Sequence, residues 1–390
     1  MPPRQRNRES NGFVPGRLVE ARQVRGMTIT RLAELSGLHK QTISKYECGL
    51  QDPREENLSI LASKLNFPHS YFFKPIQDDV ASPVHFRSLA SATKTQRAEA
   101  KARLSWVGNM LDLLDEYLEP LRPSIVDYGK GRHPTQISNE EIVDIATQVR
   151  RDFGLGNGPI SNMTWLLQNQ GVQIVRFRDL DIEELDAYSV WLKGGPRPVI
   201  ILSARASSLC RDRMNLAHEL GHLVIHRGVE PEKKEILSIM ERQAFLFGSA
   251  FLLPAQSYLK GFSYPTLDAF LALKPIWKVS IKAQIEACYR MDVIGEERRR
   301  LMYIQYNRRG WSGREPLDAE LPIDEPTYIK ESLDLLCREG VIDGPSIKDA
   351  MALYENDLAS FSGMDPNFFL GLIKSSAPRP QLRVIKRFAE

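Results

Sequence analysis

The chain has 390 residues, a formal net charge of +3, and 42% hydrophobic against 26% charged residues, which suits two or three soluble globular domains. Its four cysteines, Cys48, Cys210, Cys288 and Cys337, are scattered without a CxxC pair, which argues against disulfides and a cysteine metal site. No apolar stretch reaches the roughly 18 residues of a membrane span, and the opening residues lack a signal-peptide core, so we expect a cytoplasmic protein without membrane contacts.

Two short helices joined by a tight turn are expected near the start of the chain. Residues 28–35 form the first helix, with Thr28 at its N-cap, residues 36–38 the turn, and residues 39–47 the second helix. The residues expected to form the shared core are Leu18, Ala21, Leu32, Ala33, Leu38, Ile43, Tyr46, Leu58, Leu61, Ala62 and Leu65. This is the pattern of a helix-turn-helix, whose second helix enters the major groove of DNA.

The outer side of this segment carries residues suited to nucleic acid. The candidate DNA-binding residues are Thr28, Lys40, Gln41, Thr42 and Lys45, whose polar and charged groups suit base edges and phosphates. Residues 1–75 carry 12 Lys and Arg against 7 Asp and Glu, a net charge of +5 where the whole chain has only +3. We therefore expect binding to a double-stranded DNA operator, and the alternative is a helical bundle used for protein contacts.

A long helix is expected over residues 94–119, because apolar residues recur there at helical spacing and Pro120 and Pro123 end the pattern. A helix of about 26 residues would run about 39 Å, long enough for a spacer or for the stem of a homodimer. The alternative is a helix packed on the domain that follows. That domain is expected to begin with a helix over residues 139–153.

A β-hairpin is expected upstream of the most informative motif. Residues 187–192 and 199–202 read as strands around a turn over residues 193–198. An exposed edge of this sheet could hold a substrate segment by strand addition. An ordinary hairpin packed under helices is the alternative.

The motif is His218-Glu219-Leu220-Gly221-His222, an HExxH sequence inside an apolar-periodic stretch over residues 211–226. Helix positions i and i+4 lie on one face, so both imidazoles can reach one metal ion. Glu219 flanks the pair, placed to take a proton from a metal-bound water. The alternative is a surface helix with two unrelated histidines. The spacing favours a metal site with His218 and His222 as ligands and Glu219 as the catalytic base.

The third metal ligand is expected to be a carboxylate. A metzincin would have Gly and His where this chain has Ile225 and Gly228, so that class is excluded. His226 stands one further i+4 step along the helix, a rise of about 6 Å and a turn of about 40°, which takes it out of reach of the same ion. We expect His226 to support the site from outside the ligand set or to complement the helix C-terminus.

Glu241 is the preferred carboxylate, in the middle of a helix expected over residues 235–253. Ala244 and Gly248 lie on its face, and such small residues let two helices approach closely. Competing acids in the connector and first turn are Glu230, Glu232 and Glu235. The alternative for Glu241 is an exposed helix glutamate. A zinc ion on two His and one Glu keeps a position open for water, and manganese is the other candidate metal.

The remainder of the chain is less informative. Residues 298–314 are strongly basic and favour a solvated face over a second DNA contact. Residues 324–372 are expected to form two or three helices, with the turn FSGMDPNFF, and could sense a ligand or bind a partner.

Two segments carry a family resemblance. Residues 13–75 resemble the XRE (Cro/C1-type) DNA-binding domain through LAELSGLHKQTISKYECGLQDP. Residues from about 140 to 318 resemble the ImmA/IrrE family of metallo-endopeptidases. The motifs that carry this second resemblance are DAYSVW, RDRMNLAHELGHLVIH, ERQAFLFGSAFLLP, LKPIWKVS and GWSGREPLD. The stretch FFKP…SPVHFRSLASATK between the two is similar to proteins that fuse them.

The resemblance implies that His218, His222 and Glu241 bind the metal and that Glu219 is the base. It also implies protein substrates among DNA-bound repressors that control prophage, mobile-element or stress genes. Gly248 departs from the family, which more often has Ala there, and this leaves the ligand set intact.

The expected fold is α+β and mainly helical. Residues 1–78 are expected to form a five-helix lambda-repressor-like domain, 79–135 a helical linker, 136–319 a zincin-like α+β metallopeptidase domain, and 320–390 a helical C-terminal region without a recognisable motif.

Three functional hypotheses remain open. The protein is a DNA-binding regulator and an active or latent zinc-type hydrolase, acting on a partner repressor or on itself. Alternatively, it is a non-proteolytic, antitoxin-like repressor whose peptidase-like domain is a sensor or dimerisation platform. In the third hypothesis the helix-turn-helix only recruits a protease to its substrate at an operator. All three place the protein in the cytoplasm at the nucleoid.

Overall fold

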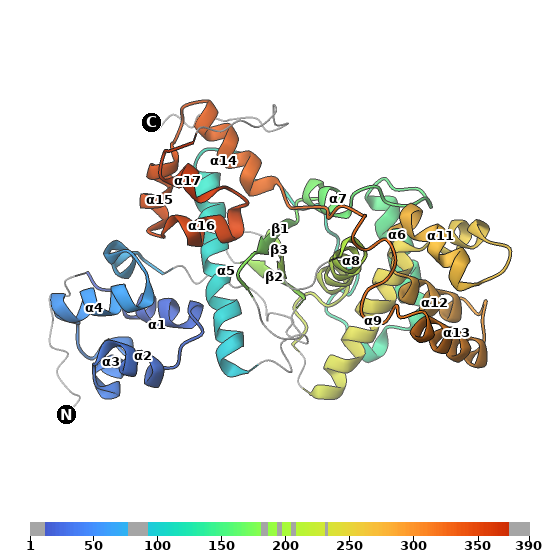
Figure 1. The fold of residues 1–390 in the computed structure, drawn as a ribbon, viewed down its shortest axis with the longest axis horizontal. Coiled ribbons are helices and arrows are strands. Elements are labelled where there is room, and N and C mark those ends of the chain that lie inside the picture. Colours follow the sequence, from blue (N-terminus) through green and yellow to red (C-terminus); the bar gives the residue numbers. More distant parts are fainter. Residues whose placement is uncertain are drawn as a thin grey trace. The chain divides into compact units, whose positions relative to one another are not determined.

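The computed structural model describes residues 12–76, 93–180, 186–192, 197–203, 208–230 and 233–373. Their contacts divide the chain into two compact units. The first unit is assigned residues 1–79, 92–120 and 329–390, and the second residues 80–91 and 121–328. The fold is mainly helical with one small sheet, so the expected α+β class is confirmed (Figure 1). The four-segment division of the chain stays a prediction.

The helix-turn-helix lies in the first unit and consists of α1 (Pro15–Val24), α2 (Ile29–Ser36), α3 (Lys40–Glu47), α4 (Glu55–Leu65) and the 3-10 helix η1 (His69–Phe73). Four α-helices and one 3-10 helix therefore stand where five helices were expected. Thr28 caps α2, because its hydroxyl accepts a hydrogen bond of 3.1 Å from the Arg31 N–H. Gly37 makes the turn into α3 with φ of 71°, a conformation that favours glycine.

The core of this domain agrees with the predicted inward face. Leu32, Ile43 and Tyr46 are buried, whereas Ala33 and Leu38 are half-buried. The other predicted core residues are all buried, and they are Leu18, Ala21, Leu58, Leu61, Ala62 and Leu65.

The long helix α5 (Lys94–Asp115) is the central helix of the first unit. It begins with a capping box between Thr93 and Gln96 and ends four residues before the predicted Glu119. Its Trp106 is fully buried, with ring-centre distances of 5.9 Å to Phe67 and 6.3 Å to Phe361. The helix packs on α1 of the helix-turn-helix, so it is not a solvent-exposed spacer.

The C-terminal region adds α14 (Tyr328–Arg338), α15 (Gly344–Met351), α16 (Glu355–Ser362) and α17 (Pro366–Phe369). Three longer helices fit the expected two or three, and α17 is a single turn inside the predicted FSGMDPNFF turn. Asp357 on α16 forms an ion pair of 2.7 Å with Arg25, at the end of α1. The same guanidinium donates to the carbonyl oxygens of Leu65 and Asn66 at 2.8 Å each. These contacts of Arg25 join α16 to the helix-turn-helix within the first unit.

The second unit contains a three-stranded sheet of order β1-β3-β2, with β1 (Gln173–Phe177), β2 (Ala187–Leu192) and β3 (Arg197–Ser203). β1 pairs with β3 in parallel, and β2 pairs with β3 antiparallel. The predicted hairpin is thus β2–β3, and most of its turn, residues 193–196, lies outside the described residues. The helices η2 (Pro134–Gln136), α6 (Asn139–Asp152) and α7 (Met163–Asn169) precede the sheet.

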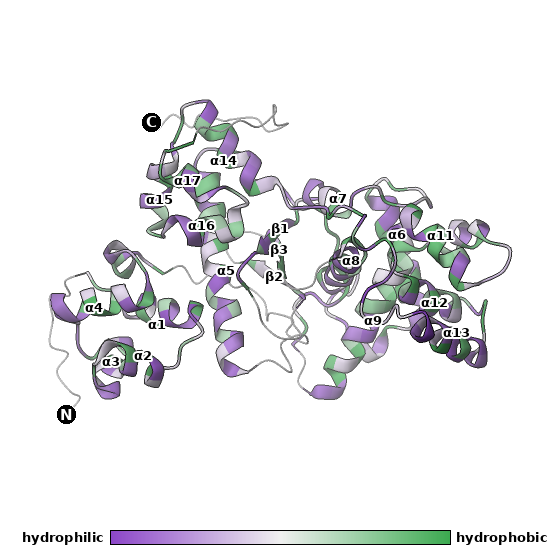
Figure 2. Ribbon diagram, in the orientation of Figure 1, coloured by the Kyte–Doolittle hydropathy of each residue, from purple (hydrophilic) through white to green (hydrophobic). Residues whose placement is uncertain are grey.

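After the sheet come α8 (Leu209–Ile225), which carries the HExxH motif, and α9 (Lys234–Leu252). The unit continues with α10 (Ala255–Tyr258), η3 (Leu259–Gly261), α11 (Leu267–Trp277), α12 (Ile281–Arg290) and α13 (Glu296–Arg308). Most residues of α13 are hydrophilic (Figure 2). Arg299 on α13 pairs with Glu286 at 3.3 Å, and Arg309, directly after the helix, pairs with Asp268 at 2.5 Å.

α8 and α9 cross closely because small residues line the crossing. A Cβ atom built on Gly248 would lie 3.1 Å from the backbone nitrogen of His218. One built on Gly221 would lie 3.2 Å from the Cα atom of Ala244. The two helices thus carry the HExxH motif and Glu241 on facing surfaces. Within the described ranges, no single helix combines the length and apolar character that a membrane crossing needs.

Candidate metal centre

His218, His222 and Glu241 bring three donor groups together between α8 and α9. The Nε2 atoms of the two histidines are 3.1 Å apart. Glu241 Oε2 lies 3.1 Å from His218 Nε2, and Glu241 Oε1 lies 3.3 Å from His222 Nε2. His222 and Glu241 are buried, and His218 is half-buried. Of the competing carboxylates, Glu230 and Glu235 are exposed, and Glu232 lies outside the described residues.

These distances fit one tetrahedral metal ion. Zinc binds imidazole nitrogen and carboxylate oxygen at about 2.0–2.2 Å, so neighbouring donors in a tetrahedron stand about 3.3 Å apart. The three measured separations, 3.1, 3.1 and 3.3 Å, are close to that value. Two imidazoles and one carboxylate also make a donor set that zinc and manganese accept. The residues present therefore fit a bound metal, with a fourth position left for water.

The electrostatics of Glu241 favour its ionised form. Burial alone would raise the pKa of this carboxyl group, but hydrogen bonds with His218 and His222 lower the pKa well below its ordinary value. The carboxylate is therefore available as a metal ligand at neutral pH.

Glu219 lies on the same helix as the two histidines but makes a different contact. Its Oε2 atom accepts a hydrogen bond of 2.6 Å from the hydroxyl of Ser189, on β2. Both side chains are buried. β2 is an edge strand of the sheet and packs against α8. The strand thus holds one oxygen of the Glu219 carboxylate through this hydrogen bond.

His226 lies behind the ligands, on the opposite side of the His222 ring from Glu241. Its Nδ1 atom is 3.0 Å from His222 Nδ1, and its Nε2 atom is 2.9 Å from Gln243 Oε1. Gln243 donates from Nε2 to the carbonyl oxygens of Pro134 and Ile137, at 2.8 and 3.0 Å. His226 is fully buried and outside the donor cluster, as its helical position predicts. The contact of Gln243 with His226 was not predicted from the sequence, because a glutamine two residues after Glu241 forms no recognisable pattern.

The candidate DNA-binding residues lie on the helix-turn-helix of the first unit. Lys40, Gln41 and Lys45 are exposed along α3, and Thr42 is half-buried. Thr28 is exposed at the start of α2, where its hydroxyl is already used as the helix cap. The amide and two cationic side chains of α3 are therefore free to meet a groove of DNA.

Comparison with known families agrees with this division of the chain. Residues 18–72 match the family described as a helix-turn-helix, and residues 168–289 match the IrrE N-terminal-like domain. No curated protein matches the chain. The second match contains all four residues of the candidate metal centre, and the first contains the five candidate DNA-binding residues. The chain therefore joins an XRE-type helix-turn-helix domain to an IrrE/ImmA-like domain of a metallopeptidase family.

Proposed function

We propose that this DNA-binding regulator uses its IrrE/ImmA-like domain as a metal-dependent endopeptidase. The observation that carries the proposal is the convergence of His218, His222 and Glu241 within 3.3 Å of one another, with Glu219 one residue from the first ligand. The substrate we propose is a repressor or another regulatory protein that acts at the same DNA, in the cytoplasm.

The side chains divide the chemistry between them. A zinc or manganese ion held by the three ligands would supply a water molecule that is acidic enough to lose a proton near neutral pH. Glu219, beside the ligands, would be the base that accepts a proton from that water when its oxygen adds to the peptide carbonyl carbon, and the acid that protonates the leaving nitrogen when the C–N bond breaks. Ser189 holds the Glu219 carboxylate in place by its 2.6 Å hydrogen bond.

The non-proteolytic alternative makes the domain a sensor or a dimerisation platform. A domain of that kind has no chemical need for a buried base beside an intact ligand set. The presence of both therefore supports the peptidase over the alternative. Recruitment of the protease to an operator by the helix-turn-helix is compatible with the same site.

Metal content and cleavage, measured together, test the proposal. The purified wild-type chain should carry about one zinc or manganese ion and cleave the regulator encoded next to its own gene. His222→Ala should lose the metal, the cleavage and the thermal stabilisation that a ligand of the folded state provides. Glu230→Ala, which changes an exposed acid in the same domain, is the matched control and should keep all three. Equal metal content in wild type and His222→Ala would contradict the assignment.

A further inference from the structure

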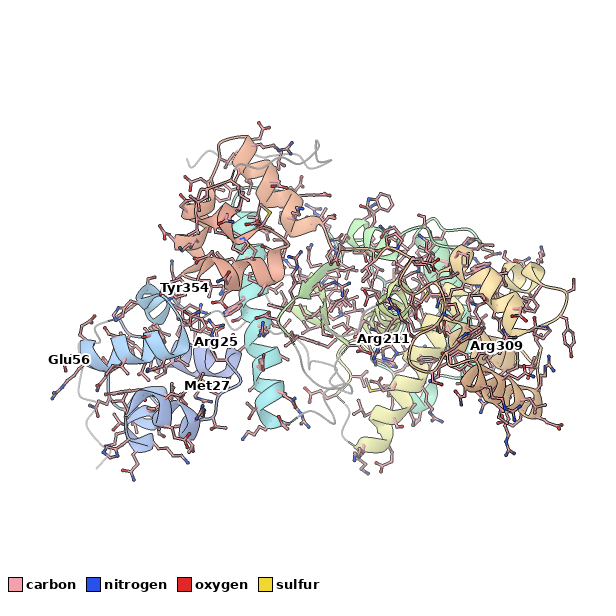
Figure 3. All side chains as sticks on the ribbon, viewed as in Figure 1. Arg25, Met27, Glu56, Arg211, Arg309 and Tyr354 are labelled. Carbon is pink, nitrogen blue, oxygen red and sulfur yellow. The ribbon has the colours of Figure 1, made fainter. Side chains whose placement is uncertain are left out.

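A cavity of about 800 Å³ lies along α8 and α9, one helical turn from the candidate metal ligands. Its lining comes from α8 and α9, from α12, and from the segment over residues 306–318, with Asp186, Ser208 and Ser280 completing it. Met214 lies four residues before His218 and Phe245 four residues after Glu241, so both stand one turn from a ligand on the same helix face. Arg211, labelled in Figure 3, lies at the same cavity one turn further from the metal. We call this cavity the side pocket.

Apolar surface makes up much of the lining of the side pocket. Met214, Phe245, Ala283 and Trp311 line it, and the side chain of Phe245 is 45% exposed although it is a large apolar group. The thiol of Cys210 contributes no charge, because burial raises its pKa to about 12. Pockets that bind ligands are lined mainly by such apolar and aromatic side chains, with a few polar groups that fix the orientation of the ligand.

The acidic side chains of the lining are already bound to partners in the same unit. Glu315 and Asp318 pair with Lys274 at 2.7 and 2.6 Å. Asp186 pairs with Arg211 at 2.6 Å, and Glu286 accepts a hydrogen bond of 2.6 Å from Tyr303. Each of these carboxylates therefore has a hydrogen-bonding or ion-pair partner within the unit.

Two cations of the lining have no such partner. Lys282 and Arg314 are exposed, and neither makes an ion pair with any residue in the part of the chain that the structure describes. Lys282 lies on α12, and Arg314 lies on the segment over residues 306–318. The side pocket thus offers apolar surface and two uncompensated positive charges to whatever enters it.

Lys274 and Glu315 hold the part of the lining that carries Lys282 and Arg314 in place. Besides its ion pair, Glu315 accepts hydrogen bonds from the backbone N–H groups of Ile281 and Lys282, at 2.8 and 3.0 Å, and from the Tyr306 hydroxyl at 3.1 Å. It therefore ties the start of α12 and the end of α13 to the segment that carries Trp311 and Arg314. Lys274 belongs to the motif LKPIWKVS and Glu315 to the motif GWSGREPLD, so both motifs help to position this part of the lining.

We propose that the side pocket receives a bulky apolar side chain of the substrate polypeptide next to the scissile bond, and that Lys282 and Arg314 bind an acidic residue beside it. The inference rests on the proposed function for the identity of the bond. The binding preference itself is a property of the pocket, and it can be measured without any hydrolysis.

Peptide hydroxamates provide that measurement, because the hydroxamate group binds the metal while the neighbouring side chain is varied. With the zinc-loaded full chain, hydroxamates bearing Leu or Phe should bind about tenfold more tightly than the Ala compound. An Asp after the Leu should tighten binding a further ~3–10-fold at low salt. Equal affinity for Ala, Leu and Phe compounds would overturn the proposal.

Variants localise the preference. Phe245→Asp should abolish the advantage of Leu over Ala, whereas Arg242→Asp, a matched change on the exposed side of α9 outside the side pocket, should keep it. The double change Lys282→Gln and Arg314→Gln should remove only the gain from Asp. Loss of the Leu advantage in Arg242→Asp to the same degree as in Phe245→Asp would count against the pocket. Selective hydroxamate binding without peptide cleavage would refute the proposed peptidase activity and support the side pocket as a binding site. Peptide cleavage without any side-chain preference would support the peptidase activity and refute the side pocket.

Discussion

The Nδ1 atom of His222 lies 3.0 Å from the Nδ1 atom of His226, and both side chains are buried. If His222 binds the metal through Nε2, its neutral ring carries the proton on Nδ1 and donates it to His226. His226 then accepts at Nδ1 and donates its Nε2–H to Gln243 Oε1, 2.9 Å away. The Gln243 side-chain amide donates hydrogen bonds to the carbonyl oxygens of Pro134 and Ile137. The hydrogen-bond chain therefore fixes the tautomer and the orientation of a metal ligand.

Gln243→Met should weaken metal binding by about 10–100-fold, because it removes the acceptor that orients His226 and hence His222. It also leaves the Pro134 and Ile137 carbonyls without their donor, which should lower the free energy of unfolding by about 1–3 kcal/mol. Competition with a zinc chelator measures the first effect and denaturant unfolding of the metal-free protein the second. Arg242→Met, at the exposed neighbouring position, is the control. Unchanged zinc affinity in Gln243→Met would show that the chain does not support the ligand.

Gly248 sets the spacing between α8 and α9. An Ala there gains about 1 kcal/mol of helix propensity but places its Cβ 3.1 Å from the His218 nitrogen, so we expect a small net change in unfolding free energy. Gly248→Val should push the helices apart, cost about 1–3 kcal/mol and weaken zinc binding. Gly295→Ala, where a Cβ meets nothing within 4 Å, should be neutral for zinc. A Val variant that binds zinc like wild type would contradict the close-packing argument.

Arg25 links the helix-turn-helix to the C-terminal helices. Its guanidinium pairs with Asp357 at 2.7 Å and stacks over the Phe67 ring, 4.5 Å from the ring centre. Arg25→Met should therefore destabilise the first unit by about 3 kcal/mol, because it leaves the buried Asp357 carboxylate without its cation. Unfolding followed by fluorescence reports on the loss, since Trp106 is buried in the same core. Arg31→Met, which changes an exposed arginine on α2, should leave the free energy of unfolding unchanged. Equal stability of the two variants would refute the stabilising link between Arg25 and Asp357.

Lys45 and Gln41, two of the exposed residues on α3, should separate affinity from specificity. Lys45→Ala should weaken binding to all DNA sequences and reduce the salt dependence, because a phosphate contact that releases counterions is lost. Gln41→Ala should instead relax the preference at one base pair, at a cost of about 1–3 kcal/mol for the cognate site. Binding to the chain's own promoter region, titrated across salt concentrations, distinguishes them. Identical effects of the two changes on cognate and random DNA would argue against base contact by Gln41.

The local parts of the site could be predicted from the sequence. Helical spacing alone places His218 and His222 on one face, and the small residues at 244 and 248 single out Glu241 as the acid that can approach them. Contacts between residues far apart in the chain could not be predicted. Arg25 and Asp357 are 332 residues apart, and nothing in either neighbourhood encodes their pairing.

Two smaller differences have local causes. Pro120 sets an upper limit on the length of α5, because a helix does not continue through it. It does not stabilise the turn before it, and the helix ends at Asp115 instead of the predicted Glu119. Ser189 sits in an all-buried strand, where period-2 patterning gives no sign that its hydroxyl faces Glu219.

Glu219→Gln tests the central claim most directly, because it removes only the proton acceptor and keeps the shape of the side chain. Zinc content and cleavage of the adjacent regulator are measured on the same preparations of wild type and variant. The account predicts about one metal ion per chain in both, unchanged binding to DNA, and loss of cleavage by about 100-fold or more in the variant. A variant that keeps its metal and still cleaves at the wild-type rate would contradict Glu219 as the base and the proposed reaction with it.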